Sequence, residues 1–235
     1  MNEKVPLSYI REITNNNYHL NSSSALPGRT TREIPEYLDY LPTMKGQNFA
    51  EFLDVRITDL GHSSILDIGC GQAQVISELK QKYGNKLSAT GLSAYDYRDE
   101  TNEEINYISG DAHHLQSYFK GQSFDAIVSV YALQHMADPL RVIKSAYRLL
   151  KKGGRGYFHF SPLIPPLLQG EPFQLENYWQ ERGIRVEIDR DGHACKYGSI
   201  VVQKDEIPNL PMPFTYTSNR ELFSSHRPLD YKLTL

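Results

Sequence analysis

The stretch ILDIGCGQA, residues 65–73, joins an apolar run to two glycines, with an acid just in front of them. The apolar run is typical of a buried strand, and a helical pattern starts at Gln72. Gly69 and Gly71 therefore fall on a turn that leads from a strand into a helix. Glycine allows a positive φ there and lets a ligand come close to the backbone. The stretch predicts a ligand-binding turn.

Strand-like and helical patterns alternate along the chain on both sides of this turn. Such alternation predicts an α/β fold, a doubly wound and mostly parallel sheet with helices on both faces. A turn at Asp191 and Gly192 separates two further strand patterns, which predicts an antiparallel hairpin at the C-terminal end of the sheet. The expected strands are residues 64–69, 87–93, 105–111, 124–133, 156–160, 184–190 and 196–205. The expected helices are residues 35–60, 72–83 and 173–182, and a segment that opens at Asp138 and closes at Gly153 and Gly154.

The length of 235 residues suits one domain with extensions. Residues 1–34 are polar, with runs of asparagine and serine, and we expect them to form a flexible arm. Residues 35–207 are expected to form the domain, which begins with a capping helix. The tail, residues 208–235, is rich in proline and aromatic side chains, so we expect it to pack on the domain.

The acid in front of the glycines, Asp67, bears on the kind of ligand. A phosphate-binding loop needs a lysine after its last glycine, and none follows here. A dinucleotide-binding turn needs a third glycine, and none follows here up to Val75 and Ile76. A carboxylate repels a pyrophosphate and attracts an ammonium group, so the turn favours a ligand with a positive end.

With Asp67, Gly69 and Gly71 in place, ILDIGCGQA resembles motif I, D-x-G-x-G-x-G, of the class I S-adenosylmethionine-dependent methyltransferases. Three further stretches resemble that family in its order: ISGDAHHL (108–115), FDAIVSVYALQHMADP (124–139) and RLLKKGGRGYFHF (148–160). The resemblance covers roughly residues 60–205. It implies a Rossmann-like methyltransferase fold, S-adenosylmethionine as cofactor, and S-adenosylhomocysteine as product.

The resemblance also implies roles for single residues. Asp111 would accept a hydrogen bond from the adenine amino group of the cofactor. Two positions depart from the family: Ala73 replaces the third glycine, and Ser93 stands where an acid usually holds the ribose, with Asp96 three residues later. The expected cofactor contacts are Asp67, Gly69, Cys70, Gly71, Ala73, Leu92, Ser93, Asp111, Ala112, Val130, Tyr131 and Gln134.

Other chemistry-bearing residues allow two interpretations each. His135 follows the fourth expected strand and could be a general base, since imidazole titrates near neutral pH, or a structural residue. Cys70 is expected to be a small packing residue rather than a thiolate, because no base lies nearby in the sequence. His113 and His114 lie beside Asp111, but no third ligand has a familiar spacing, so we expect no metal site.

The acceptor of the methyl group is less readable than the cofactor. The loop SPLIPPLLQGEPF (161–173) is apolar and follows the fifth parallel strand, which favours a small or medium organic acceptor with an apolar body. Two alternatives stay open: a methyltransferase of protein or RNA, and a methyltransferase-like module that binds the cofactor without turnover.

Composition and the N-terminal residues bear on location and partners. The formal net charge of −3 gives no positive field that would recruit nucleic acid or an anionic membrane. The first residues lack the apolar core of a signal peptide, and no apolar run is long enough to cross a bilayer. Cys70 and Cys195 lie far apart in the sequence, which favours a reducing compartment. We expect a cytoplasmic enzyme whose partner is a small-molecule acceptor, while the sequence does not reveal the oligomeric state.

Overall fold

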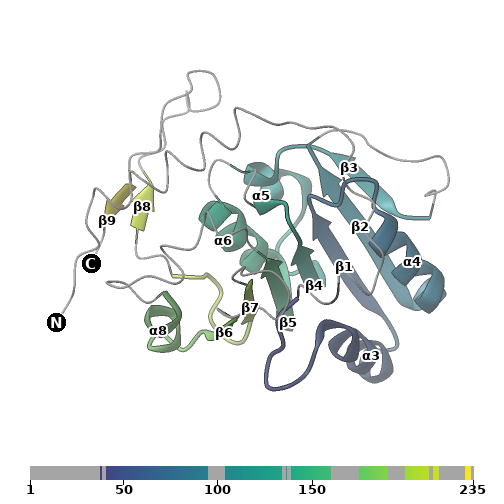
Figure 1. The fold of residues 1–235 in the computed structure, drawn as a ribbon, viewed down its shortest axis with the longest axis horizontal. Helices are drawn as coiled ribbons and strands as arrows, with labels where there is room; N and C mark the ends of the chain where they lie inside the picture. Colours follow the sequence, from purple (N-terminus) through teal and green to yellow (C-terminus); the bar gives the residue numbers. More distant parts are fainter. Residues whose placement is uncertain are drawn as a thin grey trace.

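The structure is a computed structural model that describes residues 38, 41–94, 104–133, 136, 139–159, 175–189, 199–211, 214–216 and 231–233. Within these ranges a seven-stranded sheet has the order β3-β2-β1-β4-β5-β7-β6 (Figure 1). Its strands are β1 (Ser63–Ile68), β2 (Leu87–Ser93), β3 (Asn106–Ser109), β4 (Phe124–Ser129), β5 (Leu150–His159), β6 (Arg185–Asp189) and β7 (Ser199–Gln203).

Strands β1 to β5 are parallel to one another, and β7 pairs antiparallel with both β5 and β6. A separate antiparallel pair is formed by β8 (Phe214–Tyr216) and β9 (Tyr231–Leu233). The strand order reverses at β1 and β4, as in a doubly wound sheet. The predicted fold class and the predicted C-terminal hairpin are therefore confirmed.

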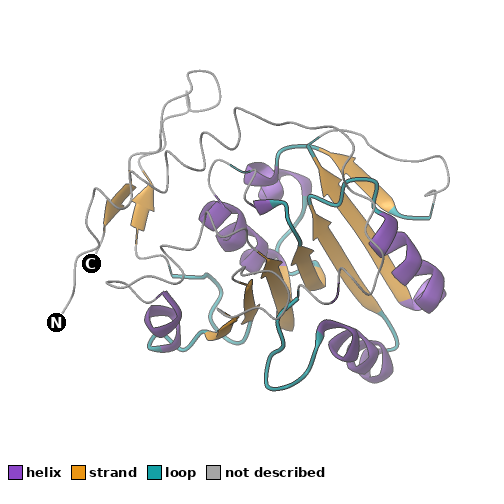
Figure 2. Ribbon diagram, in the orientation of Figure 1, coloured by secondary structure: helices purple, strands orange, loops and turns teal. Residues whose placement is uncertain are grey.

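Helices lie on both faces of the sheet (Figure 2). Because side chains alternate across a strand, Leu66 and Ile68 of β1 enter one buried cluster while Ile65 enters the other. No helix among the described ranges is long and apolar enough to cross a membrane. The helices are α3 (Phe49–Leu60), α4 (Gln74–Tyr83), η1 (Gly84–Lys86), η2 (Ala112–His114), α5 (Leu115–Tyr118), α6 (Pro139–Leu149) and α8 (Leu175–Gln180).

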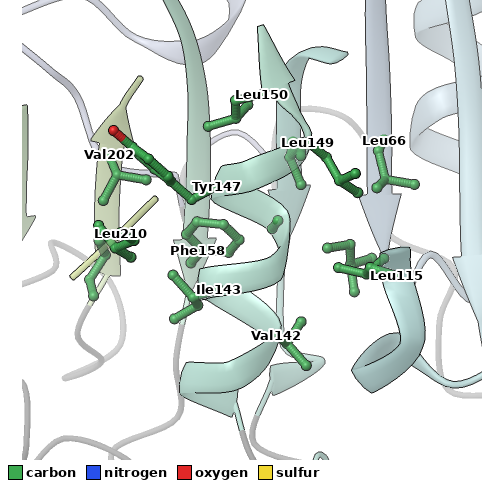
Figure 3. Packing of buried hydrophobic residues seen from close by; sticks show 14 of the residues in the cluster. Leu66, Leu115, Val142, Ile143, Tyr147, Leu149, Leu150, Phe158, Val202 and Leu210 are labelled. Atoms are coloured by element: carbon green, nitrogen blue, oxygen red, sulfur yellow. The ribbon is translucent and has the colours of Figure 1, made fainter. Parts of the chain in front are cut away.

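Helix α6 packs its apolar stripe on β5 (Figure 3). Ile143 and Tyr147 are fully buried near Phe158 of the strand. The Tyr147 hydroxyl donates to the carbonyl oxygen of Ile207 at 3.1 Å, and burial raises the pKa of this phenol to about 12. Leu210 is buried in the same cluster, so the first residues of the expected tail pack on the sheet layer. The expected arm and the rest of the tail lie largely outside the described residues, so the domain boundaries stay predictions.

The first described helix, α3, starts later than the apolar pattern from Pro35 indicated. Asn48 and Glu51 form a reciprocal capping box, in which each side chain accepts the other's backbone N–H at 2.9 Å. This box satisfies backbone donors at the first turn and fixes the helix start at Phe49. The prediction that the helix extends from Pro35 through residues 41–48 was wrong.

The two glycines expected to close α6 lie inside β5 instead, so this prediction was also wrong. The helix ends at Leu149, and the strand begins at Leu150. Gly153 donates its N–H to the carbonyl oxygen of Lys204 at 2.7 Å, and Lys204 donates back to Gly154 at 2.9 Å. A Cβ on Gly154 would lie 2.9 Å from the carbonyl oxygen of Asp125. Glycine is needed here for close strand approach rather than for a helix stop.

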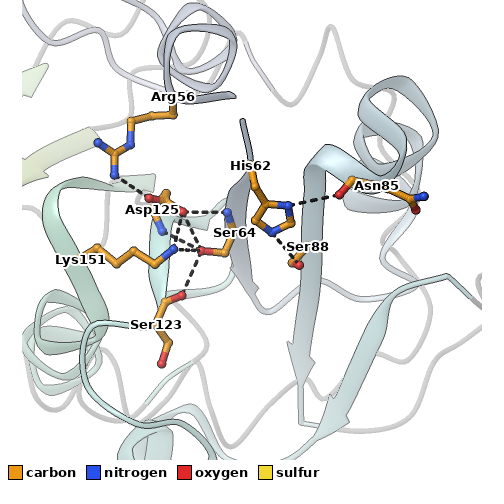
Figure 4. A network of polar contacts seen from close by, with 8 residues as sticks. All are labelled: Arg56, His62, Ser64, Asn85, Ser88, Ser123, Asp125 and Lys151. Carbon is orange, nitrogen blue, oxygen red and sulfur yellow. Dashed lines mark hydrogen bonds and ion pairs between the residues drawn. The ribbon is translucent and has the colours of Figure 1, made fainter. Parts of the chain in front are cut away.

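A buried carboxylate ties together the amino ends of the central strands (Figure 4). Asp125 of β4 lies 2.6 Å from Arg56 Nη2 of α3 and 2.7 Å from Lys151 Nζ of β5. Ser64 of β1 donates to it from both its backbone N–H, at 2.9 Å, and its hydroxyl, at 2.8 Å. Burial favours the neutral acid, but Lys151, Arg56 and Ser64 outweigh it and lower the pKa of Asp125.

Candidate functional site

The glycine turn between β1 and α4 has the left-handed backbone that its sequence predicted. Gly69, Gly71 and Ala73 have φ angles of 81°, 56° and 63°. Gly69 and Cys70 donate their N–H groups to the carbonyl oxygen of Leu92, at 2.7 and 3.2 Å. These two bonds fasten the turn to the end of β2.

Gly69 also touches the loop that follows β4. A Cβ built on Gly69 would lie 2.1 Å from the Cβ of Ala132, well inside van der Waals contact. The neighbouring Tyr131 has a φ of 54°, a strained angle for a residue with a side chain. The predicted strand 124–133 ends at Ser129, so this part of the prediction was wrong. The shorter strand frees Val130 and Tyr131 to form a loop against the glycine turn.

Asp67 lies one residue before the end of β1, with 3% of its surface exposed. In the sheet it pairs with Gly91 of β2 and Val128 of β4. Gly91 leaves room for the Cys70 side chain, whose Sγ would lie 2.7 Å from a Cβ at that position. Burial, reinforced by the charge of Asp67, raises the pKa of the Cys70 thiol, so a neutral packing residue fits this position.

Tyr107 of β3 holds the glycine turn from the other side. Its hydroxyl donates to the carbonyl oxygen of Gly71 at 2.6 Å. Tyr107 pairs with Gly91 of β2 in the sheet. The turn is therefore fastened to β2 through Leu92 and to β3 through Tyr107.

Ser93, at the position of the expected ribose acid, ends β2 and has 6% of its surface exposed. Its carbonyl oxygen accepts the N–H of Gly110 at 2.8 Å, which joins the ends of β2 and β3. Asp96, the other candidate for the ribose, lies outside the described residues.

Asp111 follows β3 and caps the short helix η2. Its Oδ1 accepts the backbone N–H of His113 at 2.9 Å and lies 2.6 Å from Nδ1 of the same residue. Burial would raise the pKa of Asp111, but the hydrogen bonds and charge of His113, with a smaller contribution from His114, lower it. Asp111 is therefore ionised at neutral pH. The next residue, Ala112, is buried.

Two aromatic rings meet at the ends of β4 and β5. The Tyr131 ring contacts the His159 ring edge-on, with 4.4 Å between the ring centroids. His159 is the last residue of β5 and has 2% of its surface exposed. The sequence-predicted residues beside this pair, Gln134 and His135, lie outside the described residues.

The structure thus brings most of the predicted cofactor contacts to one edge of the sheet, the carboxyl edge, where β1 to β5 end. Ligands of doubly wound sheets bind beyond this edge, near the reversal of strand order. Among the described residues, no cluster of three or more His, Cys, Asp or Glu side chains has the arrangement of a metal site. The residues at the edge are Asp67 to Ala73, Leu92, Ser93, Asp111, Ala112, Val130 and Tyr131.

Four side chains at this edge were not singled out as contacts by the sequence: Tyr107, His113 as a partner of Asp111, Tyr118 and His159. The contacts of Tyr107, Tyr118 and His159 join residues that are far apart in the sequence or lie in different elements. No short sequence motif could therefore indicate them. The one available signal for His113 was its position two residues after Asp111, which is typical of an aspartate that caps a turn through backbone N–H groups.

Comparison with known proteins points to one family. A family model described as "Methyltransferase domain" matches residues 66–158. The chain is 31% identical over 114 residues to a ubiquinone biosynthesis O-methyltransferase of Coxiella burnetii, covering 46% of this chain and 47% of that protein. It is 31% identical over 153 residues to a demethylmenaquinone methyltransferase of Thermotoga maritima, covering 62% of this chain and 65% of that protein. Both matches span less than two thirds of the relative's length.

Two solved structures show the same fold at low sequence identity. The plantazolicin methyltransferase BamL, in complex with a triazolic desmethylPZN analogue and S-adenosylhomocysteine, matches with a TM-score of 0.53 at 13% identity, covering 83% of this chain and 98% of that chain. The DszA carbon methyltransferase matches with a TM-score of 0.52 at 17% identity, covering 67% of this chain and 52% of that chain.

Proposed function

We propose that this chain, which belongs to the class I S-adenosylmethionine-dependent methyltransferase family, transfers a methyl group from S-adenosylmethionine to a small or medium organic acceptor. One observation carries the proposal. The glycine turn, with a buried acid just before it, is bonded to Leu92 near the end of β2 and to Tyr107 of β3, and it touches the loop after β4.

Each part of the carboxyl edge suits one part of that cofactor. The Asp67 carboxylate would attract the ammonium group of the methionine moiety. Gly69 and Gly71 leave the backbone open to close approach. Asp111 would accept a hydrogen bond from the adenine amino group, because its carboxylate is ionised and 36% of its side chain is exposed.

The chemistry that the cofactor supplies is an activated methyl group on a sulfonium. The transfer is an in-line displacement, so alignment and exclusion of water are the main contributions of the protein. When the acceptor is a hydroxyl group, its proton must also leave. His135 stays the sequence-based candidate for that base, and the Tyr131–His159 pair lies at the neighbouring strand ends.

An apolar acceptor is supported by two lines of reasoning. The relatives from C. burnetii and T. maritima are named for ubiquinone biosynthesis and for demethylmenaquinone, and both names refer to apolar quinone chemistry. The sequence of the loop 161–173, which follows the fifth parallel strand, is itself rich in leucine, isoleucine and proline. We infer that the acceptor has an apolar body and carries a hydroxyl group or a nucleophilic carbon.

Calorimetric titration with S-adenosylmethionine, S-adenosylhomocysteine and NAD tests the cofactor. We expect micromolar binding of the first two ligands and none of NAD. Binding of NAD alone, or of no ligand, would contradict the proposal. A radiolabelled methyl donor, offered with apolar phenols and quinols, then tests for a methylated product.

One observation favours a second candidate, a module that binds the cofactor without turnover. Ser93 is buried where the family usually has the acid that grips the ribose. A binding module would give the same calorimetric result and no methylated product with any acceptor. A protein or RNA acceptor is the third candidate, and it would show methyl transfer to cell extract proteins or RNA but not to small compounds.

A further inference from the structure

Asp111 is held at three points by residues that follow it in the chain. Its backbone N–H donates to the Tyr118 hydroxyl at 3.1 Å. Its Oδ1 receives the backbone N–H of His113 and faces the His113 ring, at 2.9 and 2.6 Å. Its Oδ2 lies 3.7 Å from Nδ1 of His114, beyond hydrogen-bond distance. Oδ1 therefore has two hydrogen-bonding partners in His113, whereas Oδ2 has no hydrogen bond from any residue that the structure describes.

The His113 ring is placed to act as a fixed donor. It has 7% of its surface exposed, and Nδ1 must carry a hydrogen to approach a carboxylate oxygen at 2.6 Å. Both the neutral ring with Nδ1 protonated and the charged ring meet this condition. A charge-assisted bond of this length is strong for a side-chain pair, so it restrains rotation of the Asp111 carboxylate.

Tyr118 fixes the backbone of the same residue. Its ring lies over Gly110, where a Cβ would come within 2.6 Å of the hydroxyl oxygen. Its neighbour Phe119 packs edge-on against Phe124 of β4, which anchors the end of α5 in the core. Because α5 is anchored by Phe119, the Tyr118 hydroxyl has a fixed position next to Asp111. A side chain at position 110 would clash with it, so glycine is needed there.

We propose that His113 and Tyr118 are positioning residues that set the selectivity of this site for adenine. By holding Oδ1 and the backbone of Asp111, they keep Oδ2 turned toward the 6-amino group of the cofactor. This inference rests on the proposed function, because it assigns the two residues to the adenine end of the same site. A purine with an oxygen at position 6 would bring two acceptors together and would be rejected.

Affinities for S-adenosylhomocysteine and S-inosylhomocysteine, measured by calorimetry on the full chain, test the inference. The wild type should prefer the adenosyl ligand at least tenfold, since one charged hydrogen bond contributes on the order of 2 kcal/mol. His113→Phe should reduce this preference about fivefold or more, because it keeps a ring and removes the donor. His113→Asn should keep most of the preference, because its amide nitrogen can donate from a similar place.

Tyr118→Phe tests the second contact, because it keeps the ring over Gly110 and removes only the acceptor of the Asp111 N–H. It should also reduce the preference, by about threefold, which corresponds to a net contribution near 0.7 kcal/mol for a neutral hydrogen bond. His62→Phe and Tyr83→Phe are matched controls at exposed hydrogen-bonding sites away from Asp111. Both controls should leave the preference unchanged.

The ratio of the affinities for S-adenosylhomocysteine and S-inosylhomocysteine distinguishes a role in positioning Asp111 from a role in stabilising the fold. If His113→Phe and Tyr118→Phe weaken both ligands equally, the two residues are only structural and the inference is overturned. If His113→Phe does not fold, Tyr118→Phe and His113→Asn decide in the same way. A wild type that binds neither ligand would overturn the proposed function as well. A wild type that binds both equally would overturn the inference alone.

Discussion

Asp125 and Asp111 sit at opposite ends of the sheet and are held in opposite ways. Asp125, at the amino end of β4, has a fully buried side chain and receives bonds from α3, β1 and β5. Asp111, beyond the end of β3, has 36% of its side chain exposed, and its bonds come from the residues just after it. The first carboxylate joins distant elements, whereas the second is held in place by its own loop.

The comparison shows which property distinguishes the buried acid Asp125 from Asp111, the acid that we propose to bind adenine. The pKa of both carboxyls is lowered, so both are ionised at neutral pH and ionisation does not distinguish them. The difference lies in the oxygens. Both oxygens of Asp125 accept hydrogen bonds, whereas within the described part of the chain only Oδ1 of Asp111 does so. A ligand can therefore add a bond to Asp111 without displacing one.

The largest effect on cofactor affinity is expected from a substitution at Gly69, at the carboxyl end of the sheet. Gly61, at the amino end, provides the comparison. Gly69→Ala should lower cofactor affinity more than 100-fold, because the new Cβ would lie 2.1 Å from Ala132 and force the glycine turn or the β4 loop to move. Gly61→Ala, at a φ of 74° with no atom within 4 Å of a Cβ, is the matched control for backbone strain. It should cost about 1 kcal/mol of stability and leave affinity unchanged. Equal affinities of the two variants would contradict our placement of the site.

Loss of the structural carboxylate should affect stability and spare binding. Asp125→Asn is expected to lower the free energy of unfolding by about 3 kcal/mol, since it leaves Arg56 and Lys151 without their buried counter-charge. Urea denaturation of both proteins measures this loss. Affinity for S-adenosylhomocysteine should change by less than twofold, because Asp125 lies at the far end of the sheet. A large loss of affinity with unchanged stability would reverse the roles that we give to the two ends.

The stabilisation by Asp125 should also depend on pH in a defined direction. Its pKa is lower in the folded protein than the ordinary value of 3.8, so the folded state binds the proton less readily than the unfolded chain. The stabilisation is therefore complete above pH 4 to 5 and is lost as the pH falls through the folded pKa. Urea denaturation at pH 7, 5 and 3.5 should show the same difference between the wild type and Asp125→Asn at pH 7 and 5, and a difference that begins to shrink at pH 3.5. A difference that grows as the pH falls would contradict this assignment.

The sequence predicted the elements whose cause is local. The apolar run of β1 and the glycine turn that follows it lie within the nine consecutive residues 65–73. The structure has a strand and a left-handed turn there. The alternation of strands and helices similarly predicted the doubly wound sheet. The order of the family's stretches placed Ser93 and Asp111 at the ends of the second and third strands, as the structure has them.

Features caused by contacts between distant segments could not be predicted in this way. Gly153 and Gly154 look like a helix stop, but they serve the close pairing of β5 with Lys204, which follows some fifty residues later. An apolar pattern favoured a helix from Pro35, although the capping box at Asn48 sets the start. The bond from Tyr107 to the glycine turn joins residues 36 positions apart. Hydrophobic periodicity and short motifs do not indicate which residues distant in the sequence will contact each other.

A moderate effect is expected from restoring the acid that the family usually has at the ribose position. Ser93→Asp should tighten binding of S-adenosylhomocysteine about tenfold, because a carboxylate can accept from both ribose hydroxyls at roughly 1 kcal/mol each, less a cost for its burial. Ser109→Asp, at the residue paired with Ser93 on β3, controls for the added negative charge. Equal tightening by both variants would mean that charge alone acts. No change in either would assign the ribose to another residue, with Asp96 as the next candidate.

The smallest effect is expected at Ala73, the other departure from the family's glycine pattern. Ala73→Gly relieves the strain of a φ of 63°, about 1 kcal/mol, but loses a buried methyl and adds chain entropy to the unfolded state. These terms oppose each other, so the free energy of unfolding should change by less than about 0.5 kcal/mol. Affinity for S-adenosylhomocysteine should stay within twofold.

Gln122→Gly is the control for that substitution. Gln122 has a φ of 59° on an exposed turn away from the carboxyl edge, so glycine there relieves similar strain without losing a buried methyl. It should therefore stabilise the protein more than Ala73→Gly does. If Ala73→Gly instead tightened binding tenfold, the methyl group of Ala73 would have to obstruct the cofactor. The glycine turn would then be adapted to something other than the binding of S-adenosylmethionine.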